Sequence, residues 1–496
     1  MKALIRSVFL VGLSSVASIG VAVLRSKLLA VTLGPAGVGL LAQLYGVQIA
    51  VAGIVPLGLQ VANLRYIALY RAEDPDRLAR FVSTASRMFL WLSIGATVMC
   101  LILLRPLALW ATSSAEYALM LMPAVFGIPF LVQTTTWLTY LQAGLDIRAY
   151  SRAQVITALL SLLVLAPLVL LWGLRGAALH LLLVAFVSWG VARWSAVRAM
   201  GPVTRRAIGS APFDRAAVQS MLRFGWMNLP PFVLDLLWLP LVVRPQIMHA
   251  CGATQNGIYQ VVYAFSIQYL AIPLIAVSAY SFPRISQLRD QGAINQEVNN
   301  ATRVAVLFSS AAILVMLLTR DVVIRVLYSH RFLGAVALFP VELVGDLLKA
   351  VVYAIQLPMM PQERFRARNV MSVVQYTVFA AVFFAVPASQ RLQGAIWGYT
   401  ACWAVALAMM LSYVWRVNGF RFSSANTRLL VSSFAAVGMV AGLTASPAAF
   451  ADPRIRLAGV AIAAVWVATS ITRQEVDQVM DVVRARLQSA GGGVGG

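Results

Sequence analysis

Fourteen apolar stretches, separated by short connections that carry arginine, fill this chain from Ser7 to about Thr472. About 20 apolar residues in a helix are long enough to cross the roughly 30 Å hydrocarbon core of a bilayer. Only helices and closed barrels satisfy their backbone polar groups in lipid, and barrel strands would alternate in polarity. The chain is therefore predicted to be an all-α integral membrane protein with 14 transmembrane helices.

The predicted spans use most of the 496 residues and leave only short connections between them. Their approximate bounds are 7–31, 36–69, 79–104, 118–142, 150–172, 177–199, 217–248, 253–282, 297–319, 331–358, 367–388, 393–416, 428–446 and 454–472.

Composition excludes several classes of function. Only 11% of the residues are charged, against roughly a quarter in soluble domains. The net charge of +22 would suggest nucleic acid binding in a soluble protein, but here the arginines flank apolar spans and no basic, aromatic-rich domain exists. The three cysteines lie in or beside separate spans, so they form no disulfide framework and show no metal-ligand spacing. We expect neither a nucleic acid partner nor a metal cofactor.

The cationic residues predict the orientation of the chain. One side of the predicted spans holds 27 of the 39 lysines and arginines, the other side holds 11, and Lys349 falls inside a span. The richer side is expected to be cytoplasmic, which places both termini there and requires an even number of spans. The apolar run up to Leu24 is interpreted as the first span rather than a cleaved signal, because a patterned elbow follows it. These features predict a multi-pass protein of the bacterial inner membrane.

A weak internal repeat predicts two lobes. Arg25 and Arg244 end spans 1 and 7, and Gly37 and Gly257 lie in the elbows that follow, at a nearly constant offset. Repeats that begin on the same side are parallel, and transporters often place the substrate between such repeats. The predicted parts are an N-lobe (1–199), a cytoplasmic linker (200–216), a C-lobe (217–416), two further spans (417–472), and a cytoplasmic amphipathic helix with a flexible tail (473–496).

Two segments carry a family resemblance. Residues 25–43, RSKLLAVTLGPAGVGLLAQ, resemble the start of Wzx-type O-antigen translocases, and the Gly-Asp-x-x-Lys stretch within 342–349 is similar to one in the same proteins. They belong to the multidrug/oligosaccharidyl-lipid/polysaccharide exporter superfamily. The resemblance implies a two-lobe flippase that moves an undecaprenyl-pyrophosphate-linked oligosaccharide, such as an O-antigen repeat unit, to the periplasmic leaflet by alternating access. A polysaccharide polymerase and chain-length machinery are the partners expected with it.

Such a task requires a polar, cationic passage, because an anionic pyrophosphate and a glycan cannot be stripped of water cheaply. Lysine or arginine would hold the phosphate oxygens through charge-assisted hydrogen bonds. The residues predicted to bind substrate are Lys349, Arg25, Lys27, Arg244 and Arg65. The structural alternatives are a self-neutralising pair for Lys349, headgroup contacts for Arg25, Lys27 and Arg244, and ordinary positive-inside anchoring for Arg65.

Acidic residues inside spans suggest coupling to H⁺ or Na⁺. Glu342, Asp346 and Lys349 fall at i, i+4 and i+7, on one face of a helix. Asp235 lies four residues after the second proline of a Pro230-Pro231 pair, which should break or kink the helix and free backbone carbonyls. The alternative for Asp235 is a carboxyl that satisfies the kink. Further polar residues predicted to line the passage are Gln43, Gln48, Asn63, Asn228, Gln260 and Tyr263.

Two other functions fit parts of the pattern. A cation-coupled multidrug exporter of the same superfamily would be expected to use an acidic site, whereas the polar ends of these spans are mostly basic. A membrane polysaccharide polymerase or glycosyltransferase usually needs a sizeable loop outside the membrane, and the outer connection at 320–330 is short. No catalytic nucleophile has a credible base, so we predict a transporter rather than an enzyme.

Overall fold

The computed structural model describes residues 2–56, 59–144, 146–200, 204, 211–226 and 229–470, and for a further set, including residues 2–19 and Arg65, it describes the backbone but not the side chain. Within these ranges the chain is almost entirely helical and contains no strand. The helices form two compact units. Unit 1 contains the described residues up to Tyr263 with Asp321–Ala335 and Phe365–Gly398. Unit 2 contains Ala264–Arg320, Val336–Arg364 and the described residues from Tyr399.

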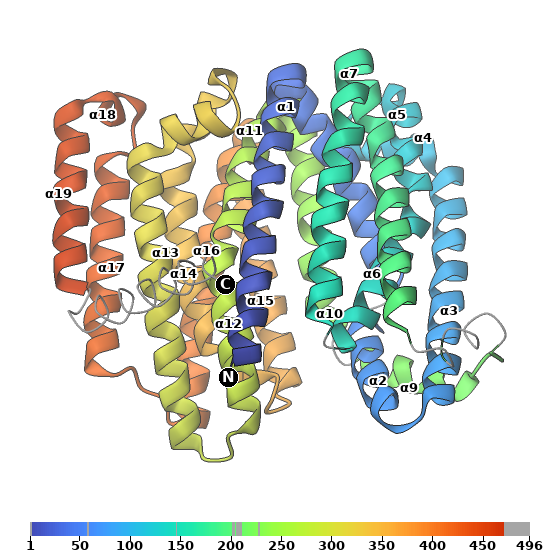
Figure 1. Ribbon diagram of the computed structural model, residues 1–496. Helices are drawn as coiled ribbons and strands as arrows, with labels where there is room; N and C mark the ends of the chain where they lie inside the picture. The colour runs from blue at the N-terminus through green and yellow to red at the C-terminus, as the bar shows by residue number, and fades with distance from the viewer. Residues whose placement is uncertain are drawn as a thin grey trace, which may run out of the picture. The chain divides into compact units, whose positions relative to one another are not determined.

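Unit 1 is built mainly on two long bent helices. Its helices are α1 (Lys2–Ile54), α2 (Leu59–Glu73), α3 (Pro75–Ile102), α4 (Leu104–Thr112), α5 (Ala118–Phe126), α6 (Ile128–Ala143), α7 (Ile147–Ala199), α9 (Arg215–Trp226), α10 (Leu229–Leu237), α11 (Arg244–Ala264) and α15 (Phe365–Ala385). α1, α5 and α6 pack on α7, α2 packs on α6 and α9, and α10 packs on α15 (Figure 1).

The bends in α1 and α7 occur where glycine is required. Gly34 in α1 has φ 65° and Gly173 in α7 has φ 53°, a region that residues with a Cβ seldom adopt. Each bend separates two predicted spans, so α1 holds the first span and part of the second, and α7 holds the fifth and the sixth.

Unit 2 contains α12 (Ala271–Gln287), α14 (Phe339–Ile355), α17 (Ser424–Leu443), α18 (Pro447–Ala451) and α19 (Pro453–Ser470), with most of α13 (Gln291–Leu327) and the larger part of α16 (Arg391–Asn418). α17 and α19 lie side by side, α14 packs on α17, and α12 packs on α14 (Figure 1). The buried guanidinium of Arg320 on α13 donates to the side chain and carbonyl of Thr444 and lies 4.0 Å from the ring centre of Phe450. These contacts fix the α17–α19 hairpin to the rest of its unit.

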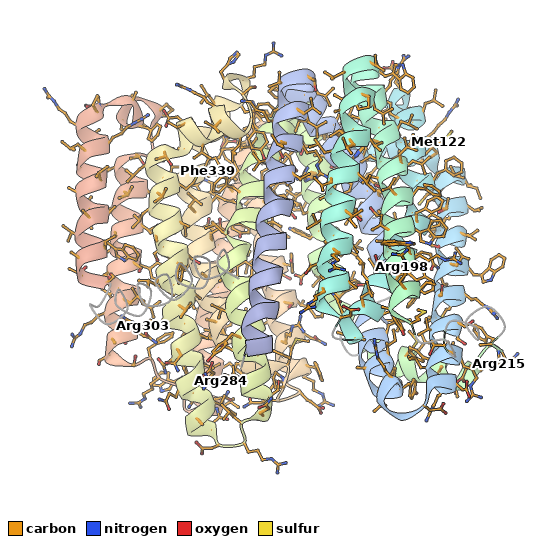
Figure 2. All side chains as sticks on the ribbon, in the orientation of Figure 1. Met122, Arg198, Arg215, Arg284, Arg303 and Phe339 are labelled. Carbon is orange, nitrogen blue, oxygen red and sulfur yellow. The ribbon has the colours of Figure 1, made fainter. Side chains whose placement is uncertain are left out.

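Arginines gather at helix ends, as positive flanks of spans do. Arg198 lies in the last turn of α7, Arg215 begins α9, and Arg284 lies in the last turn of α12 (Figure 2). The Arg198 guanidinium lies 4.0 Å from the ring centre of Trp194. Arg284 pairs with Glu297 of α13 at 3.4 Å.

The helical fold class is confirmed, and the described residues of each of the fourteen predicted segments are mainly helical. Several segments are interrupted, because proline and glycine end helices inside them. The predicted span 36–69 breaks after Ile54 near Pro56, and the span 118–142 breaks at Gly127, between two prolines. In the described part of the chain, nine helices are long and apolar enough to cross a membrane. The count of fourteen crossings stays a prediction.

The predicted division into lobes also stays a prediction. Most of the linker 200–216, and the amphipathic helix and tail at 473–496, lie outside the described residues.

Candidate functional site

Three groups of polar side chains contain ionisable residues that the sequence predicts. Two are in unit 1, around Arg244 and around Asp235, and one is in unit 2, around Asp346.

The Arg244 group is defined here as Arg244, Tyr259, Gln260 and Tyr263, all on α11. A π-helical stretch, Trp238–Val243, leads into α11 at Arg244, and the chain turns sharply at Gly252, where φ is 82°. The turn lets the first arm of α11 meet the second arm. Arg244 is only 3% exposed, and its Nη2 donates to the amide oxygen of Gln260. The guanidinium carbon lies 5.8 Å from the ring centre of Tyr259 and 5.2 Å from that of Tyr263.

The charge of Arg244 is not neutralised by an acid. Its Nη1 atom is buried and has no hydrogen-bond partner, and among the described residues no carboxylate pairs with this guanidinium. A cation removed from water normally needs an anion and a full set of acceptors. Arg244 therefore has an unused donor suited to an anionic ligand.

The other polar residues predicted in unit 1 are distributed through the helix packing. Gln43 Nε2 donates to the carbonyl of Pro240 over 2.9 Å, and Gln48 Nε2 donates to the carbonyl of Leu181 over 3.3 Å. The amide oxygens of Gln43, Gln48 and Asn63 are buried and have no partner. Gln260 and Tyr263 are thus the predicted lining residues that join Arg244, whereas Asn228 lies outside the described residues.

The two predicted cations of span 1, Lys27 and Arg25, are not members of the Arg244 group. Lys27 Nζ donates to the carbonyl of Arg325 over 2.7 Å, near the carboxyl end of α13. That position suits a cation, because the last carbonyls of a helix are unpaired and carry partial negative charge. Arg25 is partly buried on α1, and the side chain of Arg65 is outside the description.

Asp235 lies on α10 and accepts a hydrogen bond from the hydroxyl of Tyr376 on α15, over 2.5 Å. α10 begins at Leu229, directly before Pro230 and Pro231, so the predicted break is the start of a helix. The ring of Trp238 packs edge-on against Tyr376, with ring centres 5.9 Å apart. This hydrogen bond ties α10 to α15, a role that neither the predicted ion site nor the alternative of a carboxyl satisfying the kink describes.

The Asp346 cluster is defined here as Ser266, Glu342, Asp346, Lys349 and Tyr399. The three charged residues are buried on one face of α14, as their spacing predicts.

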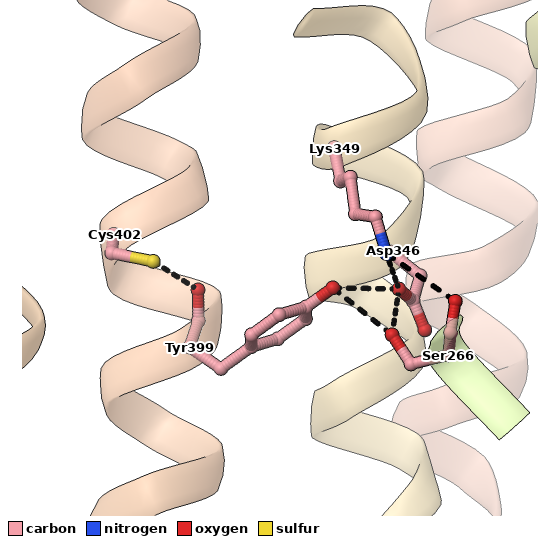
Figure 3. A network of polar contacts seen from close by, with 5 residues as sticks. All are labelled: Ser266, Asp346, Lys349, Tyr399 and Cys402. Carbon is pink, nitrogen blue, oxygen red and sulfur yellow. Dashed lines mark hydrogen bonds and ion pairs between the residues drawn. The ribbon is translucent and has the colours of Figure 1, made fainter. Parts of the chain in front are cut away.

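Asp346 is the centre of this cluster (Figure 3). Its Oδ1 accepts hydrogen bonds from the hydroxyl of Ser266 and, over 2.8 Å, from that of Tyr399, and lies 3.5 Å from Lys349 Nζ. Lys349 Nζ also donates to the carbonyl of Ser266 over 3.3 Å. The ammonium predicted to bind phosphate is therefore held in an internal ion pair.

Close packing brings Tyr399 of α16 to this cluster. A Cβ at Gly345 would lie 2.9 Å from the Tyr399 ring and from the Thr400 hydroxyl. The Thr400 hydroxyl also donates to the carbonyl of Val341 over 2.8 Å. Glycine before Asp346 therefore lets α14 and α16 approach closely enough for the tyrosine to reach the carboxylate.

The cluster contains two acids and one base. Glu342 Oε2 and Asp346 Oδ2 are buried and have no hydrogen-bond partner. If all three groups were ionised, the cluster would carry one uncompensated negative charge, which is costly in a helix interior.

Sequence reasoning missed Ser266, Tyr259, Tyr376 and Tyr399. Serine and tyrosine are common in membrane helices, so nothing marks Ser266, Tyr376 and Tyr399 before folding brings them to a charged residue. A signal existed only for Tyr259, which lies one helical turn before the predicted Tyr263.

Comparisons with known proteins give relatives of one kind. The chain is 26% identical over 415 residues to the Lipid III flippase of Escherichia coli (strain K12), a match that covers 81% of this chain and 96% of that protein. The Lipid III flippase of Shigella flexneri matches at the same identity and coverage. No family model matches.

Solved structures of membrane transporters share the fold of this chain. The Lipid II flippase MurJ in an inward closed conformation superposes with a TM-score of 0.66 at 12% identity, covering 93% of this chain and 98% of that one. An inward-facing MATE family multidrug transporter of the MOP superfamily gives 0.67 at 14% identity, covering 82% and 94%. The chain thus has the fold of MOP-superfamily membrane transporters. The relatives and structural neighbours are flippases and transporters rather than enzymes, in line with the prediction for this chain.

Proposed function

We propose that this chain is a flippase that moves a lipid-linked oligosaccharide across the bacterial inner membrane by alternating access. The likeness to Lipid III flippases over most of both chains supports this function. The MurJ and MATE folds fit a transporter that exposes its site to the two sides in turn.

The observation that carries the proposal is the unused guanidinium nitrogen of Arg244. A lipid-linked glycan crosses with its pyrophosphate, which offers several anionic oxygens to a planar guanidinium. Arg244 is buried, lacks a carboxylate partner among the described residues, and has a donor to spare. The rings of Tyr259 and Tyr263 beside it could stack on sugar faces. A cationic drug, by contrast, would be repelled by this group.

The finer identity of the substrate follows the sequence resemblance. We take it to be an undecaprenyl-pyrophosphate-linked repeat unit of the O-antigen kind. A polymerase and chain-length machinery on the periplasmic side would be the partners that consume it. The charge bias supports cytoplasmic termini.

The Asp346 cluster is the proposed coupling site. Its missing positive charge would be supplied by H⁺ or Na⁺, and binding of that ion would favour one state of the transporter. Lys349 then acts as the fixed counter-ion of Asp346 rather than as a ligand of phosphate.

A reconstitution experiment tests the function. Purified protein in proteoliposomes should flip a fluorescent polyprenyl-pyrophosphate oligosaccharide, and Arg244→Gln should reduce the rate by about 10- to 100-fold, the effect of losing roughly 1.5–3 kcal/mol from a hydrogen bond to a charged group. Arg105→Gln is the matched control, because Arg105 is exposed at the start of α4. Efflux of small cations without glycan flipping would favour the multidrug exporter instead, an alternative kept open by the MATE folds.

A further inference from the structure

Two bends of unit 1 cross with their backbones in direct contact. The crossing is defined here as residues 34–39 of α1 and 252–257 of α11. A Cβ at Gly39 would overlap the carbonyl oxygen of Ala253 and lie 2.5 Å from the nitrogen of Gly257. A Cβ at Gly257 would overlap the carbonyl oxygen of Pro35 and lie 3.1 Å from the nitrogen of Gly39. Neither position can hold a larger residue without separating the two helices.

The contact is reciprocal in the sense of a two-fold symmetric interface. Ala253 follows Pro35 by 218 positions, and Gly257 follows Gly39 by the same number. The bends themselves obey the same offset, because Gly34 and Gly252 both have positive φ. Equivalent segments of the internal repeat therefore meet each other through equivalent atoms, as in an isologous interface.

The arm of α11 after Gly252 contains both the crossing residues and Gln260, which binds Arg244. Asn256 Nδ2 donates to the carbonyl of Gly39 over 2.8 Å and is fully buried. Gln260, one helical turn further along the same arm, accepts the hydrogen bond from Arg244. Because the arm is a helix, it cannot leave Gly39 without also moving Gln260 relative to Arg244, which lies before the bend at Gly252.

We propose that this crossing is the outer closure of the transport path and that Gln260 is its latch. The inference rests on the proposed function. Pyrophosphate oxygens bind a guanidinium more strongly than a neutral amide oxygen does, so an arriving substrate displaces Gln260 from Arg244. The arm then loses one of its fixed contacts, and the equilibrium shifts toward separation of the backbones at Gly39 and Gly257. Movement of this one helix arm thereby couples substrate binding to outer opening.

A spin-label distance across the crossing tests this. Ala36 and Thr254 are exposed, follow Pro35 and Ala253, and obey the same offset. Both would be replaced by cysteine in a protein whose native Cys100, Cys251 and Cys402 are serine, and then labelled. Double electron–electron resonance in proteoliposomes then gives the distance distribution, with and without undecaprenyl pyrophosphate.

We expect one short distance without ligand and a shift to longer distance with it. Gly257→Ala should give the longer distance without ligand. Gly95→Ala on α3 is the matched control and should leave the distribution unchanged, because its Cβ meets nothing within 4 Å.

Gln260→Leu removes the latch without adding bulk at the crossing. It should lengthen the distance without ligand and make the effect of undecaprenyl pyrophosphate smaller, and it decides the matter if Gly257→Ala does not fold.

An unchanged distance in folded Gln260→Leu, or in wild type with undecaprenyl pyrophosphate while the same protein flips glycan, would overturn the latch. The proposed function fails separately, if wild-type protein flips no polyprenyl-pyrophosphate glycan while Gln260→Leu still lengthens the distance.

Discussion

Arg244 and Lys349 are both buried cations on helices, but among the described residues only Lys349 is paired with a carboxylate. Lys349 lies beside Asp346, and hydroxyls from two other segments donate to that carboxylate. Arg244 has one amide, two aromatic rings and an unused donor, with no acid paired to it in the described residues. A paired charge is satisfied permanently, whereas an unpaired one remains available for an anion that comes and goes. The difference is the basis for proposing the Asp346 cluster as the coupling site and Arg244 as a substrate ligand.

Stability is where the two cations should differ most. Lys349→Met leaves Asp346 buried without its counter-ion, and breaking a buried pair in this way costs about 3–5 kcal/mol. We expect a marked fall in the unfolding temperature of the purified protein in detergent. The double variant Asp346→Leu with Lys349→Met should recover much of the loss, since both charges are then gone. A single variant as stable as wild type would contradict the pairing.

Arg244→Met is the matched substitution at the unpaired cation. It removes a buried charge that has no acid partner and loses one hydrogen bond and the ring contacts, so the stability change should stay within about 1 kcal/mol. Flipping in proteoliposomes should still fall by about 10- to 100-fold, because a hydrogen bond to phosphate worth roughly 1.5–3 kcal/mol is lost. If this variant unfolds as readily as Lys349→Met, the distinction between the two sites is wrong.

Glu342→Gln sharpens the comparison within the Asp346 cluster. The amide fixes position 342 in an uncharged form of almost the same shape, so the remaining pair is neutral. We expect stable protein whose flipping rate no longer responds to an imposed pH or Na⁺ gradient. Measurement of transport with each gradient in turn separates the two ions, and an unaltered response to both would remove Glu342 from the coupling site.

Tyr399→Phe should give the smallest effect. It removes one donor from Asp346 but leaves those of Ser266 and Lys349, so the expected loss of stability is about 1 kcal/mol. Thr400→Val, which removes the hydroxyl that binds the carbonyl of Val341, is a control of similar size outside the cluster. A loss as large as that of Lys349→Met would mean that the tyrosine, not the lysine, is the main partner of Asp346.

The sequence predicts the helices well, because a membrane span is a local property of about 20 residues. It also places Glu342, Asp346 and Lys349 on one face, since their spacing is set by the helix itself. The proline and glycine residues at the breaks near Pro56 and Gly127 can be read in the sequence. The spans were predicted from apolar length alone, which does not detect such breaks.

Contacts between distant segments are harder to predict. The approach of Tyr399 to Asp346 depends on how closely α14 packs on α16, and the crossing at Gly39 depends on two bends 218 residues apart. The near-constant offset of the repeat was the only sequence signal for that crossing. It matched Gly37 with Gly257 as equivalent repeat positions and did not predict that Gly39 and Gly257 would be in contact.

The crossing is formed by two equivalent segments of the repeat that contact each other at one place, and this has a genetic consequence. Gly39→Ala and Gly257→Ala would each push apart the same pair of backbones, so the second change would find the contact already open. The two alleles should therefore show strong epistasis, with a double variant scarcely worse than either single one. Random mutagenesis would find both codons equally intolerant, as though a single position had been copied into two places of the gene.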